Sequence, residues 1–197
     1  MDPEQLLNPV VLVLVPIAVV VVVLLGVAIA VVKVMSGKKA ARQRKQWAQG
    51  AYSIWTGGED CGTWEEVRAQ KSLASWYGAK GPSAFWEVVA GLRRERTGNI
   101  AWDRIRAIDL LRIGCAARFI DAEQCFTEAA RIGVELQQQY RTWEDLAKGF
   151  EAGMLSWQQS SGVADPQETG RVQRNLPKLR QQIWPQVPYD ARLAIDD

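Results

Sequence analysis

The stretch "GNIAWDRIRAIDLLRIG", residues 98–114, decides the fold because it places apolar side chains on opposite sides of one helix. With about 100° of turn per residue, Ile105 and Ile108 share one side, and Leu110 and Ile113 lie nearly opposite them. A helix at a protein surface has one clearly polar face, and this stretch has none. It therefore predicts a central helix that other helices cover on two sides.

Four charged residues recur along this helix at intervals of three: Asp103, Arg106, Asp109 and Arg112. Side chains three residues apart are neighbours on a helix, so they predict a partly buried ladder of ion pairs that fixes the helix in place. The alternative is that Asp103 and Arg106 line a polar pocket, which binds a ligand or supplies an acid/base pair. The candidate residues of this structural or pocket site are Trp102, Asp103, Arg106, Asp109, Arg112, Trp143 and Glu144.

Capping signals divide the neighbouring sequence into further helices. "TWEE" at 63–66, "DAEQ" at 121–124 and "TWED" at 142–145 each begin with a capping residue, and the residue three positions later can reach back to it. No segment alternates apolar and polar residues over the length of a strand. The sequence thus predicts an all-α fold, with a compact domain of about five to six helices at residues 46–158.

Beyond this domain, residues 159–197 read as a linker and a tail that contains Pro177, Pro185 and Pro188. Such a composition predicts at most one short helix there. Trp184 and Tyr189 are expected to dock back onto the domain.

The N-terminal part contains "VVLVLVPIAVVVVVLLGVAIAVV", residues 10–32, without a charged residue. As a helix these residues span roughly 34 Å, slightly more than the hydrocarbon core of a bilayer. The preceding residues 1–9 are acidic and lack the positive region of a signal peptide. We therefore expect one uncleaved transmembrane helix at residues 10–35.

Basic residues follow this segment at once: Lys33, Lys38, Lys39, Arg42, Arg44 and Lys45. Most of them lie in a basic juxtamembrane collar at residues 36–45. Because basic residues stay on the cytoplasmic side of a membrane, we expect residues 1–9 outside and the C-terminal domain in the cytoplasm. The collar also predicts contact with the anionic headgroups of the lipid bilayer.

Composition excludes several classes of function. Of the 24 basic and 22 acidic residues, 18 and 20 follow Lys45, so this part has a net charge of −2 and lacks the basic face that nucleic-acid binding requires. The chain has no histidine, and Cys61, Cys115 and Cys125 match no zinc-binding spacing. No nucleotide-binding, metalloprotease or hydrolase motif occurs. We expect no nucleic-acid partner, metal, cofactor or enzymatic activity.

Two stretches, "AWDRIRAIDLLRIGCAARFIDAEQCF" (101–126) and "YRTWEDLAKGFEAGMLSW" (140–157), share a pattern of Trp, Asp, Arg and Gly positions. With them, residues 72–158 resemble the bacterial family catalogued as domain of unknown function 1266. The resemblance implies a helical fold and no particular reaction. The sequence departs from the family's pattern at residues 118–120, where "RFI" replaces the usual glycine and tyrosine.

These features predict a single-pass protein of the bacterial inner membrane. Its cytoplasmic domain would bind an unidentified protein, as an accessory or regulatory subunit of an envelope complex. Trp47, Trp55 and Trp184 are the expected contact residues, because Trp is enriched where proteins meet. The alternatives are a small-ligand sensor or enzyme that uses the Asp/Arg pocket, and an immunity-type protein that neutralises a toxin. Gly26 and Ala30, four residues apart, also allow a homo-oligomer through the membrane helix.

Overall fold

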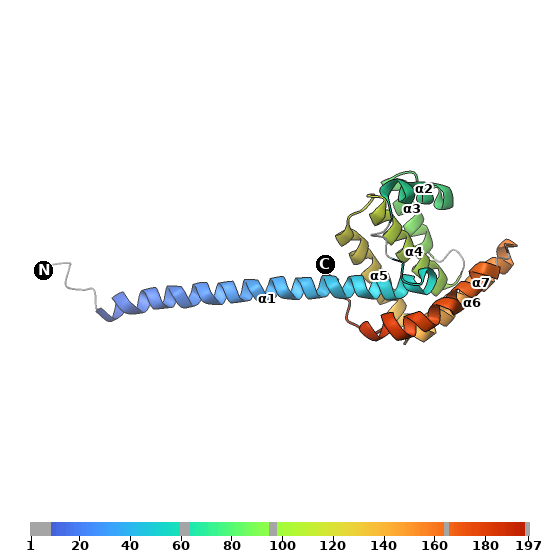
Figure 1. The fold of residues 1–197 in the computed structure, drawn as a ribbon. Coiled ribbons are helices and arrows are strands. Elements are labelled where there is room, and N and C mark those ends of the chain that lie inside the picture. The colour runs from blue at the N-terminus through green and yellow to red at the C-terminus, as the bar shows by residue number, and fades with distance from the viewer. Residues whose placement is uncertain (1–8, 60–63, 95–97, 164–165, 196–197) are drawn as a thin grey trace. The chain divides into compact units, whose positions relative to one another are not determined.

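The computed structural model describes residues 9–59, 64–94, 98–163 and 166–195, except for the side chains of residues 9–21, 166 and 169. This part of the chain is all-α and contains no strand (Figure 1). The α-helices are α1 (Pro9–Thr56), α2 (Glu66–Tyr77), α3 (Pro82–Arg93), α4 (Ile100–Ala116), α5 (Ala122–Gln139), α6 (Trp143–Ser161) and α7 (Pro166–Lys178). The chain divides into two compact units, Met1–Ala40 and Ala41–Asp197.

The first unit contains the N-terminal part of α1. Its side chains from Val22 to Met35 are exposed, and residues 36–45 of the predicted collar are helical as well. The predicted transmembrane helix at 10–35 lies partly outside the description, because the side chains of 10–21 are not included, and neither are residues 1–8. Among the residues that are described, no helix is both long and apolar enough to cross a membrane.

Helix α4 is the centre of the second unit, as the opening stretch predicts. Thirteen of its 17 residues are buried, and it packs against α2, α3, α5 and α6. Asn99 begins the helix because its side-chain oxygen accepts a hydrogen bond from the Trp102 amide at 3.0 Å. The apolar residues on both sides of α4 therefore contact different helices.

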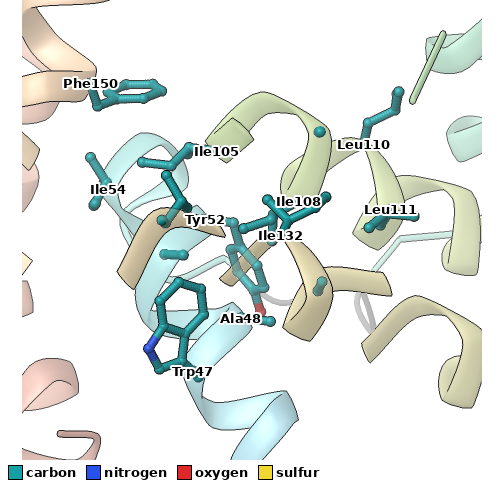
Figure 2. Packing of buried hydrophobic residues seen from close by; sticks show 14 of the residues in the cluster. Trp47, Ala48, Tyr52, Ile54, Ile105, Ile108, Leu110, Leu111, Ile132 and Phe150 are labelled. Carbon is teal, nitrogen blue, oxygen red and sulfur yellow. The ribbon is translucent and has the colours of Figure 1, made fainter. Parts of the chain in front are cut away.

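The core around α4 also includes the C-terminal turns of α1. Figure 2 shows Trp47, Tyr52 and Ile54 of α1 in the same buried cluster as Ile105 and Ile108 of α4. All five are at most 3% exposed. Since a fully buried large side chain contributes about 1.5–3 kcal/mol, this contact makes the end of α1 an integral part of the domain.

Two glycines allow other helices to approach α4 closely. A Cβ atom on Gly114 would lie 2.4 Å from the Phe85 ring of α3. A Cβ atom on Gly153 of α6 would lie 2.6 Å from the Trp102 Cβ. Neither position can hold a side chain unless the neighbouring residue moves. The absence of a side chain at these two glycines therefore lets α3 and α6 pack closely against α4.

The described chain has seven α-helices, which corrects the expectation of five to six helices and an irregular tail. The sequence after Gly162 forms α7, followed by the π-helix η3 (Leu179–Ile183) and the short 3-10 helix η4 (Trp184–Gln186). The amphipathic spacing of Val172, Leu176 and Leu179, which are buried, outweighs Pro177 near the end of α7. Pro177 has no amide hydrogen, and α7 ends at the next residue, Lys178, where the π-helix begins.

The predicted docking of Trp184 and Tyr189 is confirmed. The Trp47 indole donates a hydrogen bond to the Tyr189 carbonyl at 2.9 Å, and the Tyr189 hydroxyl donates one to the Leu136 carbonyl at 3.0 Å. The expectation that Trp47 and Trp184 lie at the surface is wrong, because they are 0% and 7% exposed. They belong to the core that joins α1 to the C-terminal segment.

The predicted helix starts are confirmed at two of three positions. Asp121 and Gln124 form a reciprocal capping box at α5, and the Thr142 hydroxyl accepts a hydrogen bond from the Asp145 amide at α6. The third signal begins at Thr63, which lies outside the described residues. Helix α2 itself begins at Glu66, without a side-chain cap from Glu65.

The turn after α4 contains a left-handed residue that is not glycine. Arg118 has a φ of 60° and an exposed side chain, and it occupies the place where the sequence departs from the family's glycine. The left-handed conformation costs a residue with a Cβ atom roughly 1–2 kcal/mol. Arg118 is therefore a strained position at which the fold tolerates a side chain.

We expect Arg118→Gly to stabilise the protein by about 0.5–1 kcal/mol, because relief of the strain exceeds the added freedom of the unfolded chain. Arg94→Gly is the matched control, since Arg94 is also an exposed arginine at a helix end but has a φ of −87°. This control should be neutral or destabilising. Thermal melting of both variants in detergent checks the prediction, and a lower melting temperature for Arg118→Gly would contradict it.

Candidate functional site

Helix α4 brings four charged residues into the interior: Asp103, Arg104, Asp109 and Arg112. A buried charge is costly unless an opposite charge and hydrogen bonds compensate it. The partners of these residues therefore show which of them support the fold and which are available for another role.

Asp109 and Arg112 form a buried ion pair. The Arg112 Nε lies 2.7 Å from the Asp109 Oδ1, and the guanidinium also lies 5.3 Å from the ring centres of both Tyr52 and Trp64. Burial raises the pKa of Asp109, while the charge and the hydrogen bond of Arg112 act in the opposite direction. This pair joins α4 to α1 and to the segment before α2, so it has the structural role that the ladder prediction describes.

Arg104 forms a second structural cluster that the sequence did not indicate. Its Nε lies 2.7 Å from Glu135 Oε2 on α5, and its Nη1 donates to the Leu92 carbonyl at 3.1 Å. Arg93 of α3 contacts the other oxygen of Glu135 at 2.5 Å. Because Glu135 is 31 residues from Arg104 in the chain, no local spacing could have revealed this cluster.

Asp103 and Arg106 are arranged differently from these pairs. Asp103 is fully buried, the Arg106 side chain is 24% exposed, and Arg106 Nη1 lies 3.9 Å from Asp103 Oδ1. That separation exceeds the length of a hydrogen bond. The guanidinium instead lies over two aromatic rings, with its centre 5.0 Å from the Trp102 ring and 5.9 Å from the Tyr77 ring.

Both residues line a cavity of about 330 Å³. The other lining residues come from α2, α3 and α6: Trp76, Tyr77, Val88, Leu92 and Trp157. Burial raises the pKa of Tyr77, and the Arg106 charge offsets this in part. The Tyr77 hydroxyl is therefore protonated at neutral pH, and it forms a hydrogen bond with the Arg106 side chain.

Trp143 and Glu144 do not join this cavity. The Trp143 ring stacks on Trp184 with 5.9 Å between centres, and its indole donates to the Val187 carbonyl at 2.8 Å. Glu144 accepts a hydrogen bond from Arg180 at 2.8 Å on the exposed side of the C-terminal segment. Both residues line a separate hollow of about 540 Å³, together with Arg141, Arg180 and Asp190. The predicted site residues thus separate into three places.

The predicted membrane-surface residues fall into an exposed group and one buried residue. Lys33, Lys38, Lys39, Arg42 and Lys45 are exposed. Arg44 is buried, and its Nη1 donates a hydrogen bond to the Ala194 carbonyl at 2.8 Å. It holds the C-terminal segment against α1 and does not belong to a surface collar. Within the described residues, no group of acidic, cysteine or histidine side chains could hold a metal ion.

The fold and the site define an all-α domain built around a charged central helix. Residues 31–189 match the family described as "Protein of unknown function (DUF1266)", and the chain belongs to this family. The matched region extends beyond residues 72–158 and includes the C-terminal turns of α1 and the segment from α7 to Tyr189, which complete the core. No match was found among the curated proteins or among the solved structures.

We expect Arg112→Met and Asp109→Asn each to destabilise the protein by about 3 kcal/mol, because each leaves a buried polar partner without its pair. The double variant should lose less than the sum of the two, since no unpaired charge remains. Thermal and denaturant unfolding of the full chain in detergent measures these free energies.

Arg131→Met is the matched control for this cycle. Arg131 pairs with Glu128 at the same spacing of three residues, but its side chain is 43% exposed, so its loss should cost less than about 1 kcal/mol. If the free-energy losses at Arg112 and Arg131 are equal, the buried pair does not have the structural role assigned to it.

Proposed function

We propose that the protein is a membrane-anchored helical module that binds another protein, as an accessory or regulatory subunit of a bacterial envelope complex. The observation that carries this proposal is the exposed apolar part of α1. Its described valine, leucine and isoleucine side chains from Val22 to Val32 are 51–67% exposed, with apolar residues on every side of the helix. A helix that is apolar all round is buried in protein or in lipid.

The charges that flank this apolar segment favour lipid, and not protein, as its surroundings. Residues 10–32 contain no charge, acidic residues precede them, and exposed basic residues follow them. This asymmetry supports an N-terminus outside and residues 41–197 in the cytoplasm, by the preference of basic residues for that side. The exposed lysines from Lys33 to Lys45 would lie at the anionic headgroups.

A binding role for the domain is supported by an exposed aromatic side chain. Trp76 of α2 is 63% exposed and lies beside Trp64, with 6.2 Å between ring centres. Large aromatic residues of this kind are enriched at contacts between proteins. The cavity beside Arg106 favours a second candidate function, the sensing of a small ligand by the same anchored domain.

We expect the full chain to sediment with membranes after washing at high pH. Replacing Leu24 and Leu25 together by Glu should release it, because each charge near the middle of a bilayer costs about 2.5–3.5 kcal/mol. In spheroplasts, protease added from outside should leave the chain uncut at Arg68.

The control is Val163→Glu, which places the same charge at an apolar residue that is 51% exposed in the domain. This variant should stay with the membrane. A wild-type chain that washes off at high pH would refute the anchor, and cleavage at Arg68 from outside would refute the orientation.

A further inference from the structure

We infer that the C-terminal turns of α1, together with α5 and α6, form a peptide-binding groove. Residues 187–195, which we call the C-terminal strap, occupy this groove until a segment of a partner protein displaces them. The inference rests on the proposed function, the binding of another protein, and names the surface and the kind of segment that binds there. It is carried by the way in which the domain holds the strap.

Four side chains of the domain donate hydrogen bonds to the backbone of the strap. Each accepting group is a main-chain carbonyl: Trp143 donates to Val187 at 2.8 Å, Trp47 to Tyr189 at 2.9 Å, Gln137 to Ala191 at 3.0 Å, and Arg44 to Ala194 at 2.8 Å. Every residue has such a carbonyl, so these contacts bind a peptide whatever its side chains are. Main-chain hydrogen bonds supply affinity in the same way in other peptide-binding grooves.

Alternate side chains of the strap supply the sequence preference. The strap buries every second residue, namely Val187, Tyr189, Ala191 and Leu193, and the residues between them are exposed. Gly133 of α5 makes room for Leu193, because a Cβ atom on this glycine would lie 2.6 Å from the Leu193 Cδ1. The strap also turns once, since the Ala191 amide donates to the Pro188 carbonyl at 3.2 Å. The groove thus fits a non-helical segment with one turn and with apolar side chains at alternate positions.

The strap can leave the groove without unfolding the helices around it. It follows η4, and the amides of Val187 and Ala191 donate to carbonyls of the nearby residues Trp184 and Pro188 and not to a helix. Departure alone would expose the rings of Trp47 and Trp143 to water, so the empty groove is unfavourable. A partner segment with the same apolar pattern covers these rings again and makes the open conformation the populated one.

A hollow beside the strap gives such a segment its first contact. This is the hollow of about 540 Å³ that Arg141 and Glu144 line, and Tyr189 and Asp190 of the strap form part of its wall. Pockets that bind ligands have volumes of about 300–1,000 Å³. An incoming side chain can therefore enter this hollow while the rest of the strap is still in place.

The test uses a peptide of the strap's own sequence, "VPYDARLAI", with a fluorescent label at its N-terminus and an amide at its C-terminus. Fluorescence anisotropy measures its binding to the full chain in detergent. We expect weak binding to the wild type, because the attached strap leaves only a small fraction of grooves open. Leu193→Ser in the chain should bind the peptide about tenfold more tightly or better, since it weakens the attached strap and raises that fraction. Arg192→Ser, at an exposed strap residue, is the matched control and should bind as the wild type does.

A second variant loosens the strap without changing a groove contact. Pro188 is exposed, and Pro188→Gly gives the released strap more freedom, so it should tighten peptide binding about two- to fivefold. In the Leu193→Ser chain, Gln137→Leu should weaken peptide binding about fivefold, because it removes one donor to the peptide backbone. Gln138→Leu, at the exposed neighbouring glutamine, should not change it.

Three results would overturn the inference. The first is no peptide binding tighter than about 1 mM in either strap variant, and the second is equal binding of a peptide that itself carries Leu193→Ser. The third is a wild-type dimer that exchanges straps between isotope-labelled copies in native mass spectrometry, which would assign the groove to self-association. None of these variants alters residues 10–35. Failure of the peptide test is therefore distinct from failure of the membrane anchor, which is measured by sedimentation.

Discussion

The burial of a charged helix is the constraint on which the rest of the structure depends. Helix α4 carries Asp103, Arg104, Asp109 and Arg112 into the interior, and water is not available there to solvate them. Several of the surrounding elements therefore supply a partner for these charges as well as apolar surface. Glu135 of α5 meets Arg104, and the rings of Tyr52 and Trp64 meet Arg112. Helix α4 is thereby held in one orientation by specific contacts on several sides.

The partners of the buried charges distinguish the cavity beside Arg106 from the ion pairs that support the fold. Three of the four buried charges form short ion pairs, whereas Asp103 lies 3.9 Å from Arg106 beside a cavity. Arg106 is held in place by the Trp102 and Tyr77 rings and by a hydrogen bond with the Tyr77 hydroxyl. This difference separates the cavity beside Arg106 from those ion pairs.

Much of the fold could be predicted from local signals. The two-sided apolar pattern predicted the central position of α4, and the capping signals at Asp121 and Thr142 marked helix starts correctly. The site could not be predicted to the same depth. Asp103/Arg106 and Asp109/Arg112 have identical spacing, and only neighbours from other helices make one pair short and leave the other open. Helix α7 was missed for a related reason, since its buried face is stabilised by tertiary contacts that outweigh its prolines.

Native-state hydrogen exchange of the full chain in detergent, read by mass spectrometry, tests the central claim most directly. If the buried charges of α4 are satisfied within a single cooperative core, the amides of Ile105–Ile113 exchange only through global unfolding and are the slowest in the domain. Those of α2, whose face carries exposed Val67 and Trp76, exchange faster through local opening. Exchange in α4 that is as fast as in α2 would contradict the account, because it would show that the charged helix opens independently of the helices around it.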